Sequence, residues 1–471
     1  MGILFDKLTE YGKSDYYPYH MPGHKRQSMG ALPMEWSATD ITEIDGFDNL
    51  HDAQGILQEI QQKAAKAYGA EESFYLVNGS TCGILSAISA VVPFGGELLM
   101  VRNCHKAVYH AAYLRQLRLH YIYPHVKTDF DLCEAVTVKQ VEQALEEYPG
   151  VSAVLVVSPT YEGRIADIEA IARVVHEKGV PLIVDEAHGA HLGFAPQFAT
   201  NSARLGADVV INSVHKTLPA MTQTALLHVN GQLVSREELK RFLRIYQTSS
   251  PSYVMMSSIE EAVDKATEGK DFETFAVKWQ RLLQDLQGCK CLRILPQMQE
   301  CIQKQHDIGK LILSVSGTEL SGQQFYDMLL KDYHLQAEMV CDSYVLCMFT
   351  MADGPEAYER LKAALLEIDA RLTVTRERKG SCLQEESSVL RLEAKLPLHE
   401  AWELEQERIS LEEAEGRQAG EFVNLYPPGT PIAVPGECLT AEVISVIKSY
   451  LAGGLAVQGI AADGSVAVLK Q

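Results

Sequence analysis

The sequence predicts an α/β protein in which a large domain with a mostly parallel β-sheet is followed by a smaller α+β region. Three observations support this fold class. From about residue 56 to 230, helical stretches alternate with short apolar runs, as in βα units on a parallel sheet. After about residue 275, amphipathic helices and strands are mixed instead. The length of 471 residues indicates two or three domains with a large buried core.

The changes in pattern divide the chain into four expected parts. These are an N-terminal segment (1–55), the large domain (56–275), a small α+β domain (276–375) and a C-terminal domain (376–471). The Glu-rich stretch 400–421 reads as a helix with a solvated face. We find no internal repeat and no low-complexity segment.

Individual elements of the large domain follow from local signals. A helix is expected over Ile56–Ala70, which is rich in Ala, Gln, Glu and Lys and has Gly69 near its end. A second is expected over Ile168–Gly179. Short apolar runs predict strands at Val154–Val157, Leu182–Val184 and Val209–Ile211. In the small domain, LILSVSG and YVLCMFTM carry the strand-like pattern.

Composition and charge narrow the function classes. Charged residues are 22%, hydrophobic residues 46%, and there are 33 Gly and 18 Pro, which is typical of a globular protein. The 42 basic and 62 acidic residues give a net charge of −20, so we expect neither a nucleic-acid partner nor an anionic membrane surface. The N-terminus lacks a basic segment followed by an apolar one, and no run approaches 18 apolar residues, so we expect a cytoplasmic protein.

The cysteines predict neither a disulfide framework nor a metal site. Ten cysteines are scattered along the chain, and reduced thiols are the expected state. Cys289 and Cys291 form a single CxC, which lacks the second ligand pair of a structural zinc site. We therefore expect no metal.

The most informative residues are Asp185 in LIVDEAHGAH and Lys216 in INSVHKTLPA, each just past the carboxyl end of a predicted strand. Open α/β sheets bind their ligands at that edge. A carboxylate and a lysine one βα unit apart suit pyridoxal phosphate, because the lysine binds the cofactor covalently and the carboxylate keeps the pyridine nitrogen protonated. Either residue alone is more often structural than catalytic.

Further segments fit a cofactor phosphate and a ring. Asn78–Val91 is a Gly-Ser-Thr turn that runs into an apolar helix, where free N–H groups and the hydroxyls of Ser80 and Thr81 suit a phosphate. A plain helix cap is the alternative. His105 follows another strand and could stack on a ring, although an isolated histidine is more often structural. Ser213 and His215, just before Lys216, add two possible phosphate donors.

Together these segments resemble the ornithine/lysine/arginine decarboxylase family of fold-type-I pyridoxal-phosphate enzymes, in a short form without an N-terminal wing domain. The resemblance runs nearly from end to end. It is carried by HMPGHKR (20–26), DITEIDGFDNLHDAQG (40–55), NGST, NCHKA, SPTYEG (158–163), VDEAHGAH, SVHKTLPAMTQ (213–223), TSSPSY (248–253) and YPPGTPIAVPGE (426–437). SVHKTLPAMTQ, NCHK and YPPGTPIAVPGE together are highly specific.

The resemblance implies roles for single residues. Lys216 would bind the cofactor covalently, Asp185 would pair with the pyridinium nitrogen, and His105 would stack on the ring. His188 would line the pocket. The implied phosphate contacts are Ser80, Thr81, Ser213 and His215. The segment 248–250, with Ser249 and Ser250, would reach the phosphate of a neighbouring subunit, which implies a homodimer or larger assembly with shared sites. Cys82 departs from relatives that carry a hydroxyl there, so a third side-chain contact to the phosphate is in doubt.

The implied reaction is loss of CO2 from a basic amino acid (arginine, lysine or ornithine), which leaves the amine, in polyamine metabolism or acid resistance. Lys216 and His105 are candidates for the acid that protonates Cα. Glu437 is a candidate for binding the distal cation of the substrate, and arginine is slightly favoured by overall resemblance to short-form bacterial sequences. Aminotransferases, aldolases and β-eliminating enzymes share the Asp and Lys pair. An aminotransferase also needs a firm α-carboxylate partner, for which Arg164 is the residue to examine. A pyridoxal-phosphate-binding homologue without turnover is a further alternative.

Overall fold

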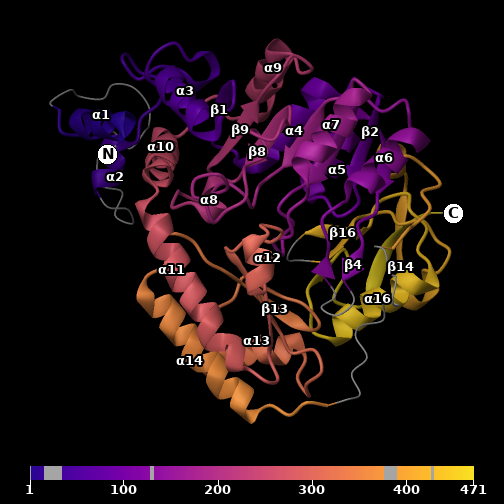
Figure 1. Cartoon of the computed structure of the whole chain (residues 1–471). Helices are drawn as coiled ribbons and strands as arrows, with labels where there is room; N and C mark the ends of the chain where they lie inside the picture. Colours follow the sequence, from indigo (N-terminus) through magenta and orange to yellow (C-terminus); the bar gives the residue numbers. More distant parts are fainter. Residues whose placement is uncertain (1, 15–33, 128–131, 376–389, 426–428, 471) are drawn as a thin grey trace.

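The computed structural model describes the whole chain except residues 1, 15–33, 128–131, 376–389, 426–428 and 471 (Figure 1). The HMPGHKR motif and the first three residues of YPPGTPIAVPGE therefore lie outside the described residues.

A seven-stranded sheet forms the centre of the large domain, in the order β1-β9-β8-β7-β6-β2-β3 (Figure 1). Only β9 runs against its two neighbours, so the carboxyl ends of the other six strands meet at one edge. This confirms the predicted mostly parallel sheet. The strands are β1 (Glu72–Leu76), β2 (Glu97–Val101), β3 (Arg118–Ile122), β6 (Ala153–Val157), β7 (Leu182–Asp185), β8 (Val209–Asn212) and β9 (Ala225–Val229).

Helices flank this sheet, and both predicted helices form. The first ends where predicted, because Gly69 takes φ +74° after Tyr68. The second begins where the Asp167 side chain accepts a hydrogen bond from the Ala170 N–H. The helices of the large domain are α3 (Ile56–Tyr68), α4 (Gly79–Val91), α5 (Lys106–Arg115), α6 (Val138–Glu147), α7 (Ile168–Glu177), α8 (Val214–Thr217) and α9 (Arg236–Tyr246). Between α5 and α6 lies the short pair β4 (Val126–Lys127) and β5 (Leu132–Cys133).

A second sheet, entirely antiparallel, lies opposite the carboxyl edge of the first, in the order β10-β11-β13-β12. The two apolar runs of the small domain form its central strands. Helices α11 and α14 pack against each other beside it (Figure 1). The elements are α11 (Lys270–Asp285), β10 (Arg293–Leu295), α12 (Met298–Ile302), β11 (Lys310–Ser314), α13 (Gly322–Lys331), β12 (Met339–Val340), β13 (Tyr344–Met348) and α14 (Pro355–Arg371).

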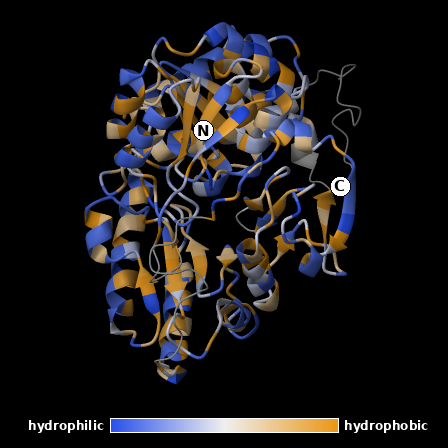
Figure 2. Cartoon of the chain, turned by 90° about the vertical axis from the view of Figure 1, so that its right-hand side faces the viewer, coloured by the Kyte–Doolittle hydropathy of each residue, from blue (hydrophilic) through white to orange (hydrophobic). Residues whose placement is uncertain are grey.

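The buried core connects the large and small domains. One apolar cluster extends from Leu4 in α1 (Ile3–Gly12), through α10 (Tyr253–Glu268), to Ile368 in α14. In both sheets the strands carry the apolar residues (Figure 2). Because one core spans these regions, it gives no domain boundary at residue 55 or at residue 275. Both boundaries stay predictions. The N-terminal segment also contains α2 (Met34–Thr39).

The C-terminal region has a core of its own, between Leu392 and Val468. The prediction of a helix over 400–421 is wrong. Residues Gln406–Ser410 form a strand that pairs in register with Ser465–Leu469, and this distant pairing overrides the helix preference of the Glu residues. The elements are α15 (Leu398–Ala401), β14 (Gln406–Ser410), β15 (Val423–Leu425), β16 (Thr430–Ala433), α16 (Ala441–Ala452), β17 (Val457–Gln458) and β18 (Ser465–Leu469).

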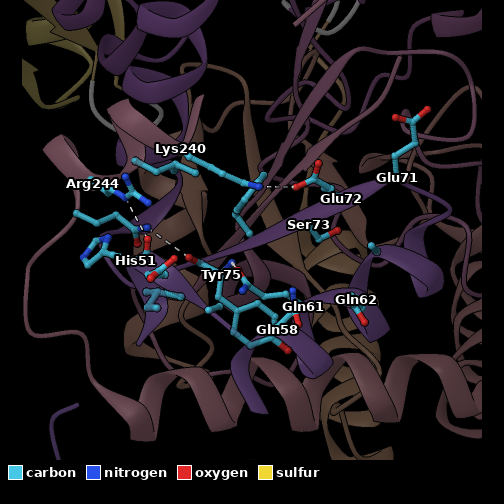
Figure 3. A pocket seen from close by; sticks show the side chains of 17 residues that line it. His51, Gln58, Gln61, Gln62, Glu71, Glu72, Ser73, Tyr75, Lys240 and Arg244 are labelled. Carbon is cyan, nitrogen blue, oxygen red and sulfur yellow. Dashed lines mark hydrogen bonds and ion pairs between the residues drawn. The ribbon is translucent and has the colours of Figure 1, made fainter. Parts of the chain in front are cut away.

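The outer edge of the large sheet, strand β1, is covered by amide side chains. Gln61 Oε1 accepts from the Tyr75 N–H at 3.0 Å, and Gln247 both accepts from the Val77 N–H at 3.0 Å and donates to the Tyr75 carbonyl at 3.4 Å. A cavity of about 360 Å³ runs beside this strand between α3 and α9 (Figure 3). Its wall includes Lys240, which pairs with Glu72 at 3.1 Å.

Three features of the described residues bear on other functions. No helix among them is long and apolar enough to cross a membrane. The nine cysteines in this part of the chain are all free thiols. No group of three or more His, Cys, Asp or Glu residues within the described ranges could hold a metal ion.

Candidate active site

The residues predicted to bind the cofactor gather at the carboxyl edge of the large sheet. Asp185 is the last residue of β7, and Lys216 lies in α8, which follows β8 directly. His105 is the residue that caps α5 after β2, and Ser80 lies in the first turn of α4 after β1. In Figure 1 this edge faces the small domain. The ends of four different strands, β1, β2, β7 and β8, therefore each bring one side chain to this edge.

Asp185 is buried, Lys216 is partly buried, and the two charges act on each other. Burial raises the pKa of Asp185, and the nearby Lys216 opposes that rise. Burial lowers the pKa of Lys216, and Asp185 opposes that fall. Asp185 is 4% exposed, and its Oδ1 accepts from the Ala187 N–H at 3.2 Å. The pair presents a reactive amine and a carboxylate in a low-dielectric site, which is the combination expected where chemistry occurs.

His188 lies between two lysines. Its Nε2 is 3.0 Å from Lys216 Nζ, and its Nδ1 is 2.7 Å from Lys310 Nζ. Lys310 begins β11 of the small domain and is 0% exposed. Burial, followed by the charges of Lys310 and Lys216, holds the pKa of His188 well below its usual value, so the ring is neutral. The Tyr161 ring packs against it at 4.6 Å.

His105 is also neutral. Burial is the main cause of its lowered pKa of about 4, and Lys216 adds to the effect. Its Nδ1 accepts from the Ala107 N–H at 3.2 Å and caps α5. Because Nδ1 is an acceptor, the remaining ring proton is on Nε2.

A hydroxyl pair marks the start of α4. Ser213 Oγ donates to Ser80 Oγ at 2.9 Å. Asn78 precedes the helix but makes no side-chain cap bond, and its Oδ1 accepts from the Thr248 N–H of the same chain at 3.1 Å. The first N–H groups of α4 are thus uncapped by Asn78 and lie beside the two serines, an arrangement that suits an anion.

The other predicted phosphate contacts are either exposed or already use one of their polar atoms in another bond. His215 Nδ1 bonds the Thr224 carbonyl at 2.8 Å, which leaves Nε2 for another partner. Thr81, Ser249 and Ser250 are exposed. Cys82 Sγ donates to the Gly79 carbonyl at 3.1 Å, so its side chain is already used within the helix turn.

Glu186 braces the segment that carries Asp185 and His188, and sequence reasoning missed it. It is 1% exposed. Its Oε2 accepts from the Ser202 N–H at 2.9 Å and from the Ser202 hydroxyl, and its Oε1 accepts from Asn212 Nδ2 at 3.1 Å. Asn212 also donates to the Glu186 carbonyl at 3.0 Å. These bonds join the end of β7 to the end of β8.

A cavity of about 220 Å³ lies next to the cluster, where all three main regions meet. Tyr161, which packs on His188, lines it. Its wall also carries two carboxylates, Glu162 from the large domain and Asp342 from the small domain. Glu162 is 9% exposed, and burial raises its pKa. Apolar residues of the C-terminal domain, such as Leu425 and Ile432, close the other side.

Two other residues of interest are engaged elsewhere. Glu437 is 0% exposed, and its Oε2 accepts from Arg102 Nη2 at 3.0 Å and from the Val434 N–H at 2.9 Å. Oε2 is thus engaged by Arg102, whereas Oε1 is buried without a hydrogen-bond partner among the described residues, so the expectation that Glu437 binds substrate stays a prediction. Arg164 pairs with Glu134 at 2.7 Å and with Glu300 at 2.9 Å. It is therefore not available as the α-carboxylate partner of an aminotransferase.

Sequence comparison gives two family matches. Residues 3–328 match the model described as Orn/Lys/Arg decarboxylase, major domain, and residues 385–457 match Orn/Lys/Arg decarboxylase, C-terminal domain. The chain is 32% identical over 475 residues to the arginine decarboxylase of Bacillus subtilis, covering 97% of this chain and 95% of that protein.

Structure comparison agrees. The constitutive lysine decarboxylase of E. coli superposes with a TM-score of 0.83 at 19% identity, over 100% of this chain and 82% of that one. Serine palmitoyltransferase from Sphingomonas wittichii superposes with a TM-score of 0.54 at 16% identity, over 69% of this chain and 80% of that one. The fold is thus fold type I, as predicted. On the family matches, the chain belongs to the Orn/Lys/Arg decarboxylase family and is a pyridoxal-phosphate-dependent decarboxylase of basic amino acids.

Proposed function

We propose that the cluster around Lys216 is the decarboxylation site and that arginine is its substrate. The contact between Lys216 and His188 beside a carboxylate-lined cavity carries the assignment. The choice of arginine rests on the 32% identity to the B. subtilis arginine decarboxylase over nearly the whole of both chains. A role in polyamine metabolism stays a prediction.

The residues fit pyridoxal phosphate. Lys216 is a partly buried amine of lowered pKa, which suits covalent attachment of an aldehyde. Asp185 is a buried carboxylate that suits a protonated ring nitrogen. The uncapped start of α4, with Ser80 and Ser213, suits the phosphate. When bound, the cofactor supplies the electron sink for the bond that breaks, while these residues hold and orient it.

The substrate side chain would occupy the cavity beside Tyr161. A basic amino acid carries a distal cation, and Glu162 is a buried carboxylate in the cavity wall for which the structure gives no ion pair within the described residues. Cation binding would compensate the desolvation of Glu162. We therefore propose Glu162, in place of Glu437, as the partner of the distal cation.

The substrate assignment is tested by incubating the purified enzyme and cofactor separately with arginine, lysine and ornithine and identifying the amine released. We expect agmatine from arginine to dominate. Glu162→Gln should raise KM for arginine by about tenfold or more, with a smaller change in kcat, whereas Glu169→Gln on the exposed face of α7 should change neither. Turnover of lysine or ornithine alone would overturn the choice of arginine. An unchanged KM in Glu162→Gln would overturn the role of Glu162.

We also propose that Ser249 and Ser250 complete the phosphate site of a second subunit. They are exposed, and the neighbouring Thr248 N–H already bonds Asn78 of its own chain at the start of α4. The segment thus lies near its own site as well, and subunit exchange separates the two arrangements. Lys216→Ala is mixed under mild denaturant with a double Ala variant at Ser249 and Ser250. Regained activity supports a shared site, and a mixture that stays inactive contradicts it.

A further inference from the structure

Lys310 is a buried lysine that none of the decarboxylase motifs includes. It comes from the small domain, yet its Nζ reaches His188 of the large domain at 2.7 Å. A side chain that is 0% exposed and ordinarily charged loses hydration when it is buried, and this loss must be offset by contacts. Its position next to Lys216 and His188 therefore calls for a functional reason.

The backbone holds Lys310 in this place. The Asp307 N–H donates to the Gly163 carbonyl at 2.8 Å, and the Ile165 N–H donates to the Gln305 carbonyl at 3.1 Å, so the turn before β11 is docked on the large domain. Gly163 has φ +102°, and a Cβ there would lie 2.9 Å from Lys310 Cβ and Cγ. Only glycine permits this approach.

The three side chains form a continuous hydrogen-bonded chain. Each ring nitrogen of His188 faces one amine, Nε2 toward Lys216 at 3.0 Å and Nδ1 toward Lys310 at 2.7 Å. A neutral imidazole has one N–H donor and one acceptor. One lysine therefore donates to the ring while the other accepts from it.

We propose that His188 relays a proton between Lys216 and Lys310, so that Lys310 is a positioning residue for the reactive amine. In the transfer the Lys216 Nζ–H and His188 Nδ1–H bonds break, while the His188 Nε2–H and Lys310 Nζ–H bonds form. The net charge is unchanged, and nothing is oxidised or reduced. This inference rests on the proposed role of Lys216.

The surrounding charges suit such an exchange. Burial lowers the pKa of Lys310 to about 8 and also lowers the pKa of Lys216, so neither amine is a strong trap for the proton. The His188 pKa, held far below its usual value, keeps the ring neutral between transfers. Asp185 and Glu338 act on Lys216, and Asp307, Glu338 and Glu162 act on Lys310. The groups that face His188 are His105, His215 and the Tyr161 ring.

The relay would serve both states that the reaction requires of Lys216. As a nucleophile, the amine must give up its proton, which Lys310 takes. As a candidate acid toward Cα, it must carry a proton, which Lys310 returns. Because Lys310 comes from the small domain, both states depend on that domain being docked.

The test measures the rate at which the apoenzyme captures pyridoxal phosphate, by absorbance, as a function of pH. Lys310→Gln keeps an N–H toward His188 but cannot exchange a proton, and His188→Gln interrupts the chain while both lysines remain. We expect each variant to move the midpoint of the rate profile upward by about one pH unit, and so to slow capture near neutral pH by about tenfold. The double variant should be no slower than either single one.

If Lys310 acted on Lys216 only through its charge, the two variants would behave differently from each other. Loss of the Lys310 charge alone would raise the midpoint in Lys310→Gln, but His188→Gln would leave it unchanged or lower it, and that result would overturn the relay. An unchanged midpoint in Lys310→Gln would overturn it too. Lys331→Met, an exposed lysine of α13, is the matched control. If Lys310→Gln does not fold, as judged by circular dichroism, Lys310→Met replaces it.

A labelling experiment distinguishes an error in the relay from an error in the proposed function. Borohydride reduction of the loaded enzyme, followed by peptide mapping, should place the label on Lys216 in every variant that binds cofactor. A label on Lys216 with normal profiles overturns the relay alone. A label on another lysine overturns the proposed site.

Discussion

Two buried charge clusters occupy two domain contacts, and they differ in how their charges are matched. At the contact with the small domain, Lys216, His188 and Lys310 place basic groups next to one another. At the contact with the C-terminal domain, Arg102 pairs with Glu437 at 3.0 Å, with side-chain exposures of 1% and 0%. Burial lowers the pKa of all three members of the first cluster, whereas Glu437 holds the pKa of Arg102 above its ordinary value despite burial.

The difference indicates that the first cluster serves the reaction, whereas the second holds two domains together. Arg102 is nearly saturated, because it also donates to Tyr109 Oη at 2.8 Å and to the Pro431 carbonyl at 2.9 Å. Within the described residues, Arg102 Nε and Glu437 Oε1 are the atoms of this pair that have no hydrogen-bond partner. The lysine cluster has protons that can move, because its members lack full compensation by opposite charge. We therefore expect mutations in the first cluster to remove activity and mutations in the second to remove stability.

The largest effect should come from Lys216→Ala. Without the amine that we propose binds the cofactor covalently, turnover should fall by at least about 10⁴-fold. The midpoint of thermal unfolding should not fall, because the variant removes a buried charge near other basic groups. Released amine and calorimetry are the measurements. A destabilised but active variant would break the distinction between the two clusters.

Glu437→Gln should do the reverse. It leaves the Arg102 guanidinium buried without its partner, which costs about 3–5 kcal/mol of the free energy of unfolding. Urea unfolding measures this loss, and turnover per bound cofactor should be nearly normal. Glu407→Gln, which breaks the more exposed pair with Arg417, should cost less than about 1 kcal/mol. If Glu437→Gln instead raises KM selectively in a stable protein, Glu437 meets the substrate after all.

Asp185→Asn should lower turnover about 100- to 1,000-fold, equivalent to about 2.7–4 kcal/mol of lost charge stabilisation. The cofactor should still bind, because the proposed phosphate contacts and Lys216 are intact. Absorbance titration gives the occupancy and amine release gives the turnover. Asp264→Asn, at a surface pair with Lys63, serves as control. Turnover close to that of the wild type would exclude Asp185 as the partner of the ring nitrogen.

The smallest effect is a pH dependence of stability from Glu186. Burial raises its pKa from 4.5 to about 7. Between these values the folded state holds a proton that the unfolded state has lost, so stability falls as pH rises through this window, by about 3 kcal/mol at most. Glu186→Gln should flatten this part of the curve, measured by urea unfolding at pH 5 and pH 8. Identical slopes in wild type and variant would show that the carboxylate is ionised throughout.

The sequence predicts the part of the site that lies at strand ends. Asp185, Lys216 and Ser213 follow apolar strands, and the direction of parallel strands brings them to one edge. Lys310 could not be found this way, because it begins a strand of another sheet, and a lysine there is ordinarily solvated. Only the docking of the small domain turns it inward.

Long-range pairing decides two further features that the local sequence does not show. Glu437 reads as a loop carboxylate in a PGE segment, and nothing local shows that Arg102, far earlier in the chain, is its partner. Strand β14 was mistaken for a helix because its partner β18 lies near the C-terminus. In both cases the deciding contact is remote in sequence.

The glutamine cover on β1 has a consequence for how the protein behaves at high concentration. A free sheet edge is a template on which another chain can add a strand and begin to aggregate. Gln61 and Gln247 already occupy the outward N–H and carbonyl of Tyr75 and the N–H of Val77. An incoming strand would have to displace two buried amides before it could form backbone bonds with Tyr75 or Val77. These two side chains thus hinder the addition of a strand at β1, the step by which a fibril would grow from this edge of the sheet.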